Sequence, residues 1–154
     1  MKNIASITTL TLVAAAAMAD AAPAAAPAAA WSQSANLALT SNYVWRGLSQ
    51  NANSIALQGG FDVAHTSGLS AGVWASSIKF AEGLEVDLYA NYGFKVAGVD
   101  LSVGYIAYVY TGASSINFEE ANISATYAGV TAKVSKGISG VKDYYYELGY
   151  TYSI

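Results

Sequence analysis

The chain has 154 residues, of which 54% are apolar and only 11% are charged, and its formal net charge is −3. One domain is expected at this length, and the small acidic excess argues against a nucleic-acid-binding protein. Cysteine is absent and His65 is the only histidine, which excludes disulfides, thiolate or multi-histidine metal sites, and cysteine nucleophiles.

The start of the chain has the features of a secretory signal peptide. Lys2 precedes an uncharged, Ala-rich hydrophobic stretch, and Ala17-Met18-Ala19 matches a small-x-small cleavage site. A membrane anchor is the alternative, but the stretch is short and prolines follow it at once. We expect an exported chain with three parts: a signal peptide over 1–19 (cleavage as late as 21), an Ala/Pro-rich disordered leader over 20–34, and a folded body over 35–154.

In the body, apolar and polar residues alternate with a period of two. Leu84, Val86 and Leu88 would share one face of a strand, and Glu85 and Asp87 the other. A helix would mix these two sets around its circumference, and no apolar run of the body is long enough for a membrane-spanning helix. We expect eight strands, at about 35–46, 54–65, 69–80, 84–95, 99–110, 118–127, 130–137 and 143–154.

Strand length and link length favour a membrane-spanning barrel. About ten residues at about 3.3 Å each, tilted by about 40°, rise roughly 25 Å, the height of an outer-membrane apolar band. Bacterial barrels also have long extracellular and short periplasmic links. The expected extracellular links are 47–53, 81–83, 111–117 and 138–142, and the periplasmic ones are 66–68, 96–98 and 128–129. The predicted fold is all-β: an eight-stranded antiparallel up-and-down transmembrane β-barrel.

A soluble barrel with an apolar interior would show the same alternation. It would also carry a dense Lys/Glu surface, whereas the polar set here contains many small residues that suit a narrow lumen. Charges buried in such a lumen must be paired, so we expect Arg46, Glu85, Asp87 and Lys95 to form one network with neighbouring Asp62 and Asp100. The residues predicted to line the lumen are Arg46, Asp62, Glu85, Asp87, Lys95, Asp100, Glu120, Lys133 and Glu147.

The last predicted strand alternates up to the final residue. Its pattern resembles the C-terminal signal by which outer-membrane barrels are recognised for assembly, with Ile154 in place of the usual terminal Phe or Trp. A Tyr-rich surface strand is the alternative. The residues assigned to the assembly signal are Gly149, Tyr150, Tyr152 and Ile154.

The stretch from Asn36 to Gln50, which contains Trp45-Arg46-Gly47, resembles the opening strand of the TorF-like porin family. Three further stretches continue the resemblance in the same order, at 56–62, 72–76 and 84–90. The resemblance covers residues 36–110 and implies an outer-membrane β-barrel, in a group of bacterial proteins of largely unknown function.

No catalytic, metal or cofactor site is expected. His65 falls beside a turn on the lipid-facing side. Glu85 and Asp87 have two interpretations: they form a paired-carboxylate or cation site, or they belong to the lumen network. We therefore expect a non-enzymatic porin-like channel for small solutes in the outer membrane. The alternative is a non-conducting structural or surface-interaction barrel with a plugged polar lumen. Expected partners are outer-membrane lipids and the barrel-assembly machinery, with a homo-oligomer left open.

Overall fold

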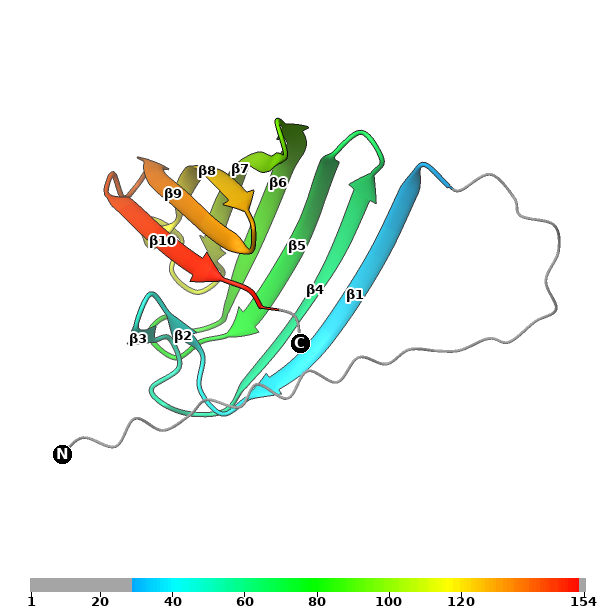
Figure 1. Cartoon of the computed structure of the whole chain (residues 1–154). Coiled ribbons are helices and arrows are strands. Elements are labelled where there is room, and N and C mark those ends of the chain that lie inside the picture. The colour runs from blue at the N-terminus through cyan, green and yellow to red at the C-terminus, as the bar shows by residue number, and fades with distance from the viewer. Residues whose placement is uncertain (1–28, 153–154) are drawn as a thin grey trace, which may run out of the picture.

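The computed structural model describes residues 29–152 and is all-β over that part of the chain. Eight strands form one antiparallel sheet in which each strand pairs with its neighbours in the chain (Figure 1). These strands are β1 (Trp31–Thr40), β4 (Ala56–His65), β5 (Leu69–Ser77), β6 (Leu84–Val96), β7 (Val99–Tyr110), β8 (Phe118–Tyr127), β9 (Val130–Ser139) and β10 (Tyr144–Tyr150).

Three short elements lie outside the large sheet. Strands β2 (Val44–Trp45) and β3 (Leu48–Ser49) form a small hairpin between β1 and β4, and a 3₁₀ turn, η1 (Ser114–Ile116), precedes β8. Within residues 29–152, no helix has the length and apolar character needed to cross a membrane. The eight strands of the large sheet follow each other in the predicted antiparallel up-and-down order, so this prediction is confirmed.

The predicted closure into a barrel is not seen in this structure. The sheet is curved, but β1 pairs only with β4 and β10 only with β9, so both remain edge strands (Figure 1). Alternation in a sequence fixes which face of a sheet a residue occupies. It does not fix how far the sheet curls, because closure depends on the tilt and stagger of all strands together.

The strand boundaries agree best in the middle of the chain, where β7 and β8 have the predicted limits. The first strand begins at Trp31, so residues 31–34 belong to the sheet and not to the leader. It also ends at Thr40 instead of residue 46, because Arg46 (φ 48°) and Gly47 (φ 84°) form the two-residue turn of the β2–β3 hairpin. Positive φ at both central residues is the geometry that a tight hairpin turn requires.

The two ends of the sheet differ in their links, as predicted. At one end, residues 66–68, 97–98 and 128–129 make short turns, while residues 41–55, 78–83, 111–117 and 140–143 make longer links at the other. We call these the short-link end and the long-link end. The start of β1 and the end of β10 both lie at the short-link end, because the order is up-and-down with an even number of strands.

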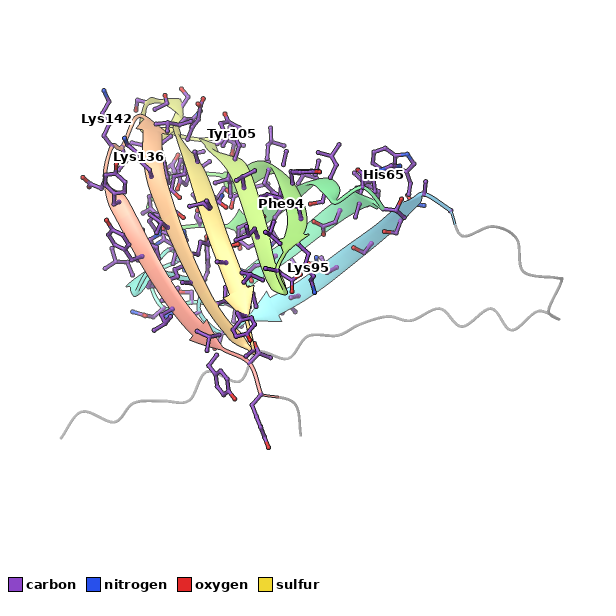
Figure 2. All side chains as sticks on the ribbon, turned by 45° about the horizontal axis from the view of Figure 1, so that its top comes forward. His65, Phe94, Lys95, Tyr105, Lys136 and Lys142 are labelled. Atoms are coloured by element: carbon purple, nitrogen blue, oxygen red, sulfur yellow. The ribbon has the colours of Figure 1, made fainter. Side chains whose placement is uncertain are left out.

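The outer face of the sheet is apolar and exposed. Leu57, Phe61 and Leu88 are 52%, 44% and 49% exposed, and Leu148 on β10 is 80% exposed. On β5, Val73 is on this face and Trp74 is on the other. Phe94 and Tyr105 can be followed on the same outer face (Figure 2).

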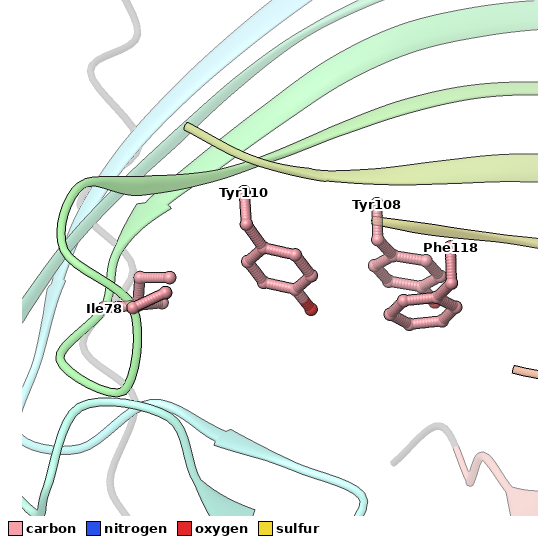
Figure 3. Packing of buried hydrophobic residues seen from close by; sticks show 5 residues of the cluster. Ile78, Tyr108, Tyr110 and Phe118 are labelled. Atoms are coloured by element: carbon pink, nitrogen blue, oxygen red, sulfur yellow. The ribbon is translucent and has the colours of Figure 1, made fainter. Parts of the chain in front are cut away.

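The inner, concave face of the sheet carries the polar side chains. The largest fully buried side chains are Glu85, Asn51, Ser76 and Ser135, the reverse of a soluble protein, whose buried side chains are mostly apolar. A small apolar cluster lies on this face at the long-link end, where the Tyr108 and Phe118 rings stack at 4.2 Å beside Tyr110 and Ile78 (Figure 3). The exposed side of the sheet is thus apolar, and its buried side is largely polar.

Candidate functional site

Residues 41–55, which we call the strap, link β1 to β4 and lie across the inner face at the long-link end. The ring of Tyr43 is 5.3 Å from Trp74 on β5. The ring of Trp45 is 5.8 Å from Tyr108 on β7 and 6.0 Å from Phe118 on β8. The strap therefore starts at the edge strand β1 and passes over the middle of the sheet.

Arg46, at the tip of the β2–β3 hairpin, makes the strongest polar contact of the strap. Its Nη1 and Nη2 donate to Oε1 and Oε2 of Glu120 on β8, both at 2.7 Å. The guanidinium also lies 4.2 Å from the centre of the Trp45 ring and 4.1 Å from that of Tyr145 on β10. Since the strap follows β1 and touches β10, it connects the two open edges of the sheet at this end.

The charge of Arg46 is well supported in this setting. Burial alone would lower its pKa, but the hydrogen bonds to Glu120 and the charge of that carboxylate raise the pKa above its ordinary value. The Glu120 side chain is only 3% exposed. A bidentate Arg–carboxylate pair is among the strongest polar contacts in proteins, so Arg46 ties the strap to the sheet.

A second polar contact ties the strap to β6. The Tyr43 hydroxyl donates to Oε1 of Glu85 at 2.8 Å, and its backbone N–H donates to Oδ1 of Asn51 at 3.0 Å. Burial, followed by the neighbouring Glu85 carboxylate, raises the pKa of the Tyr43 phenol, so Tyr43 stays neutral and acts as a donor. Asn51 is itself 1% exposed, which shows that the strap is packed and not only laid over the sheet.

The predicted charge network is divided into separate ion pairs. Beside Arg46 and Glu120, Lys95 pairs with Asp100 at 3.0 Å, and Lys133 pairs with Glu147 at 3.4 Å. The predicted network joining Arg46, Glu85, Asp87 and Lys95 is therefore wrong. Arg46 lies in a hairpin turn and not on a strand, and Asp87 and Lys95 are about 26 Å apart along one extended strand.

Three of the predicted lumen acids remain without a cation in these pairs: Asp62 on β4, and Glu85 and Asp87 on β6. Tyr43 donates to Glu85, and the Tyr89 hydroxyl donates to Oδ1 of Asp62 at 2.5 Å. Asp87 is 7% exposed, and its buried Oδ1 has no hydrogen-bond partner in the part of the chain that the structure describes. Strands β4 and β6 both border β5, so these acids gather in one half of the inner face.

A glycine on β5 makes one of these contacts possible. Gly72 lies between Asp62 and Tyr89 in the ladder, and a Cβ at this position would come within 2.6 Å of both the Asp62 carboxylate and the Tyr89 ring. The missing side chain lets the Tyr89 ring lie across β5.

The other predicted positions lie away from this region. Nδ1 of His65 is 2.8 Å from the Ser67 hydroxyl, and the His65 ring lies 4.6 Å from that of Trp31 at the short-link end. Among residues 29–152, no group of three or more His, Asp or Glu side chains is arranged to hold a metal ion.

The predicted assembly residues lie at the end of the chain. Gly149 and Tyr150 end β10, and Tyr150 is 67% exposed on the outer face. Tyr152 follows the strand and is 73% exposed. Ile154 lies outside the described residues, as do the predicted signal peptide and most of the predicted leader.

Comparison with known proteins places the chain in a family. Residues 24–153 match a family described as "Bacterial protein of unknown function (Gcw_chp)". The chain belongs to the Gcw_chp family. No curated protein and no solved structure matches it. The family description assigns no activity, so the resemblance to the TorF-like porins stays a prediction, and function must be argued from the sheet and the strap.

Sequence reasoning missed the strap. Residues 43–46 were assigned to a strand, so Tyr43 and Trp45 were not recognised as contacts across the sheet, and Glu120 was not matched with Arg46. Gly47 was the available signal, because glycine readily adopts the positive φ that a tight hairpin turn requires.

Proposed function

We propose that this Gcw_chp protein is an outer-membrane β-barrel that acts as a porin-like channel for small solutes. The observation that carries the proposal is the reversed polarity of the sheet, with Leu88 exposed on one face and Glu85 buried on the other. An apolar face as large as this sheet needs a cover. A lipid bilayer covers such a face while leaving the polar face to line an aqueous interior.

Closure of the sheet is part of the proposal. Strands β1 and β10 run in opposite directions, so they can pair as the other neighbours do. An open edge in lipid leaves backbone N–H and C=O groups without partners, which costs several kcal/mol for each group and favours pairing of β1 with β10. The strap supports closure, because it already brings Arg46, which follows β1, against Tyr145 on β10.

The inner face has space for water. A cavity of about 220 Å³, lined in part by Tyr89, Lys133 and Ser135, lies against the ion-paired Glu120. A water molecule occupies about 30 Å³ in the liquid, so the cavity has room for water.

Export through the predicted signal peptide, and insertion guided by Tyr150, Tyr152 and Ile154, would bring the chain to the outer membrane.

A second candidate function is a non-conducting barrel, and the strap favours it. Trp45 packs on Tyr108 and Phe118, and Arg46 is bound to Glu120. An eight-stranded barrel has an interior that side chains can just fill. A strap held this firmly across one end would close the remaining space, and the protein would then act through its surface links.

Conductance of the refolded protein in planar lipid bilayers separates the two functions. A channel predicts steady conductance of the wild type, which Arg46→Ala increases because it releases the strap. Lys95→Ala is the matched control, since Lys95 is in an ion pair at the other end of the sheet. Absence of conductance in the wild type and in Arg46→Ala would favour the non-conducting barrel.

The membrane location has an independent test. The chain has no cysteine, so an introduced cysteine is the only thiol that a reagent can find. Leu88→Cys on the outer face should be protected from a water-soluble maleimide in lipid vesicles and reactive after unfolding. Its neighbour Tyr89→Cys, on the inner face, reports whether water reaches the interior. Full labelling of Leu88→Cys in vesicles would overturn the membrane proposal.

A further inference from the structure

We propose that the inner face selects small cations over anions, and that Glu85 and Asp87 form the selective position. This inference rests on the proposed channel function and adds the class of solute. It is carried by the distribution of charges on the inner face and by the unpartnered oxygen of Asp87.

The inner face holds more acids than its bases can neutralise. Arg46, Lys95 and Lys133 are each paired with an acid, so none of these three basic residues is left to balance a further carboxylate. The acids that remain are Asp62, Glu85 and Asp87. Neutral tyrosine hydroxyls bind two of them and do not change their charge. Where these carboxylates are ionised, the path along this face is negative, which attracts cations and repels anions.

The excess of acidic residues over basic ones is concentrated at one level of the sheet. Glu85 and Asp87 are two residues apart on β6, so their side chains leave the same face. Glu85 is 2% exposed and Asp87 is 7% exposed. Burial strengthens the interaction of a carboxylate with a nearby cation, because fewer water molecules screen it.

The unpartnered oxygen of Asp87 is a second observation, independent of the number of acids on the inner face. Its buried Oδ1 has no hydrogen-bond partner among residues 29–152, and leaving such an acceptor unpaired is costly. A cation, or a water molecule that accompanies it, would satisfy this oxygen. The side chain points to the inner face, where the strap passes over β6.

The surroundings of Asp87 suit a cation as well. Trp74 lies opposite Asp87 in the β5–β6 ladder, and the Tyr43 ring packs on Trp74 at 5.3 Å. The faces of aromatic rings attract cations through their quadrupole. Carboxylates and aromatic faces at the same level would both lower the energy of a cation and neither would lower that of an anion.

Reversal potentials in planar bilayers test the inference. The refolded full chain is placed in neutral phosphatidylcholine with a potassium chloride gradient, at a pH of about 9, where carboxylates are ionised. We expect the wild type to prefer potassium over chloride. The double variant Glu85→Gln, Asp87→Asn should lose most of this preference, because it removes the charges while keeping the shape and an acceptor for the Tyr43 hydroxyl.

Two further variants make the result specific. Glu82→Gln removes the same charge from an exposed link at the same end and should keep the wild-type preference. Asp62→Asn should reduce the preference by less than the double variant, and it provides a reading if the double variant fails to fold, as judged by heat-modifiable gel mobility.

The outcomes separate this inference from the proposed function. Conductance without cation preference in the wild type, or a double variant that folds and keeps the full preference, would overturn the inference and leave the channel in place. A wild type that never conducts would overturn the channel function and this inference together.

Discussion

The long-link end and the short-link end belong to the same strands but hold their charged residues in different ways. At the long-link end, Arg46 and Glu120 form a bidentate pair under the strap, with side-chain exposures of 19% and 3%. At the short-link end, Lys95 and Asp100 form a pair in which both side chains are more than half exposed. One sheet thus offers a packed and an open setting for the same type of contact.

The difference identifies the long-link end as the more tightly packed end of the sheet. The strap and the apolar cluster of Tyr108, Tyr110 and Phe118 lie at the long-link end, next to the acids Glu85 and Asp87. The short-link end has tight turns such as Ala97-Gly98, and its Lys95–Asp100 pair is exposed. Substitutions at the two ends should therefore differ in cost even where the residue types match.

Arg46→Ala is expected to have the largest effect on stability. It leaves Glu120 buried without its cation, which costs about 3–5 kcal/mol where the site is dry. Water that enters the inner face would reduce this cost, so the size of the loss also reports on how tightly the strap seals the interior. A lower urea midpoint of the detergent-refolded protein measures it.

Glu120→Gln is the companion to Arg46→Ala. It removes the charge but keeps oxygen and nitrogen atoms for hydrogen bonding to Arg46 and Tyr108, so it should cost less than Arg46→Ala. If Arg46→Ala and the wild type unfold at the same urea concentration, the strap is not held by this pair and the contrast between the two ends is lost.

The alternation of residues predicted the strands and their faces, because period two depends only on local backbone geometry. Val99–Tyr110 and Phe118–Tyr127 were predicted without error for this reason. The strap was missed because its contacts, such as Arg46 with Glu120, join residues far apart in the chain. We expected a network because buried charges must be paired, but this requirement does not determine which acid pairs with which base.

The two ends can also be compared through their turns. Gly47 in the strap hairpin and Gly98 between β6 and β7 both have φ of 84°, and a Cβ on either would meet no atom of residues 29–152 within 4 Å. Gly47→Ala and Gly98→Ala should therefore each cost about 1–2 kcal/mol, from backbone strain alone. Gly149→Ala is the control, because it has the same free space without the positive φ.

Equal losses from Gly47→Ala and Gly98→Ala in urea unfolding would show that the ends differ in side-chain packing and not in their turns. A much larger loss from Gly47→Ala would instead show that the strap hairpin depends on its backbone geometry to place Arg46. A loss from Gly149→Ala as large as that from Gly98→Ala would contradict the strain argument.

Lys95→Gln is expected to have the smallest effect. The Lys95 and Asp100 side chains are 63% and 59% exposed, and water and salt screen an exposed pair, so its loss should cost about 0–1 kcal/mol. The two residues face each other in the β6–β7 ladder, and glutamine can still donate a hydrogen bond to the Asp100 carboxylate. The urea midpoint should stay close to that of the wild type at low and at high salt.

A loss of stability that approaches that of Arg46→Ala would mean that the short-link end is buried by a further part of the protein or by the membrane. The contrast between the packed and the open end would then no longer hold.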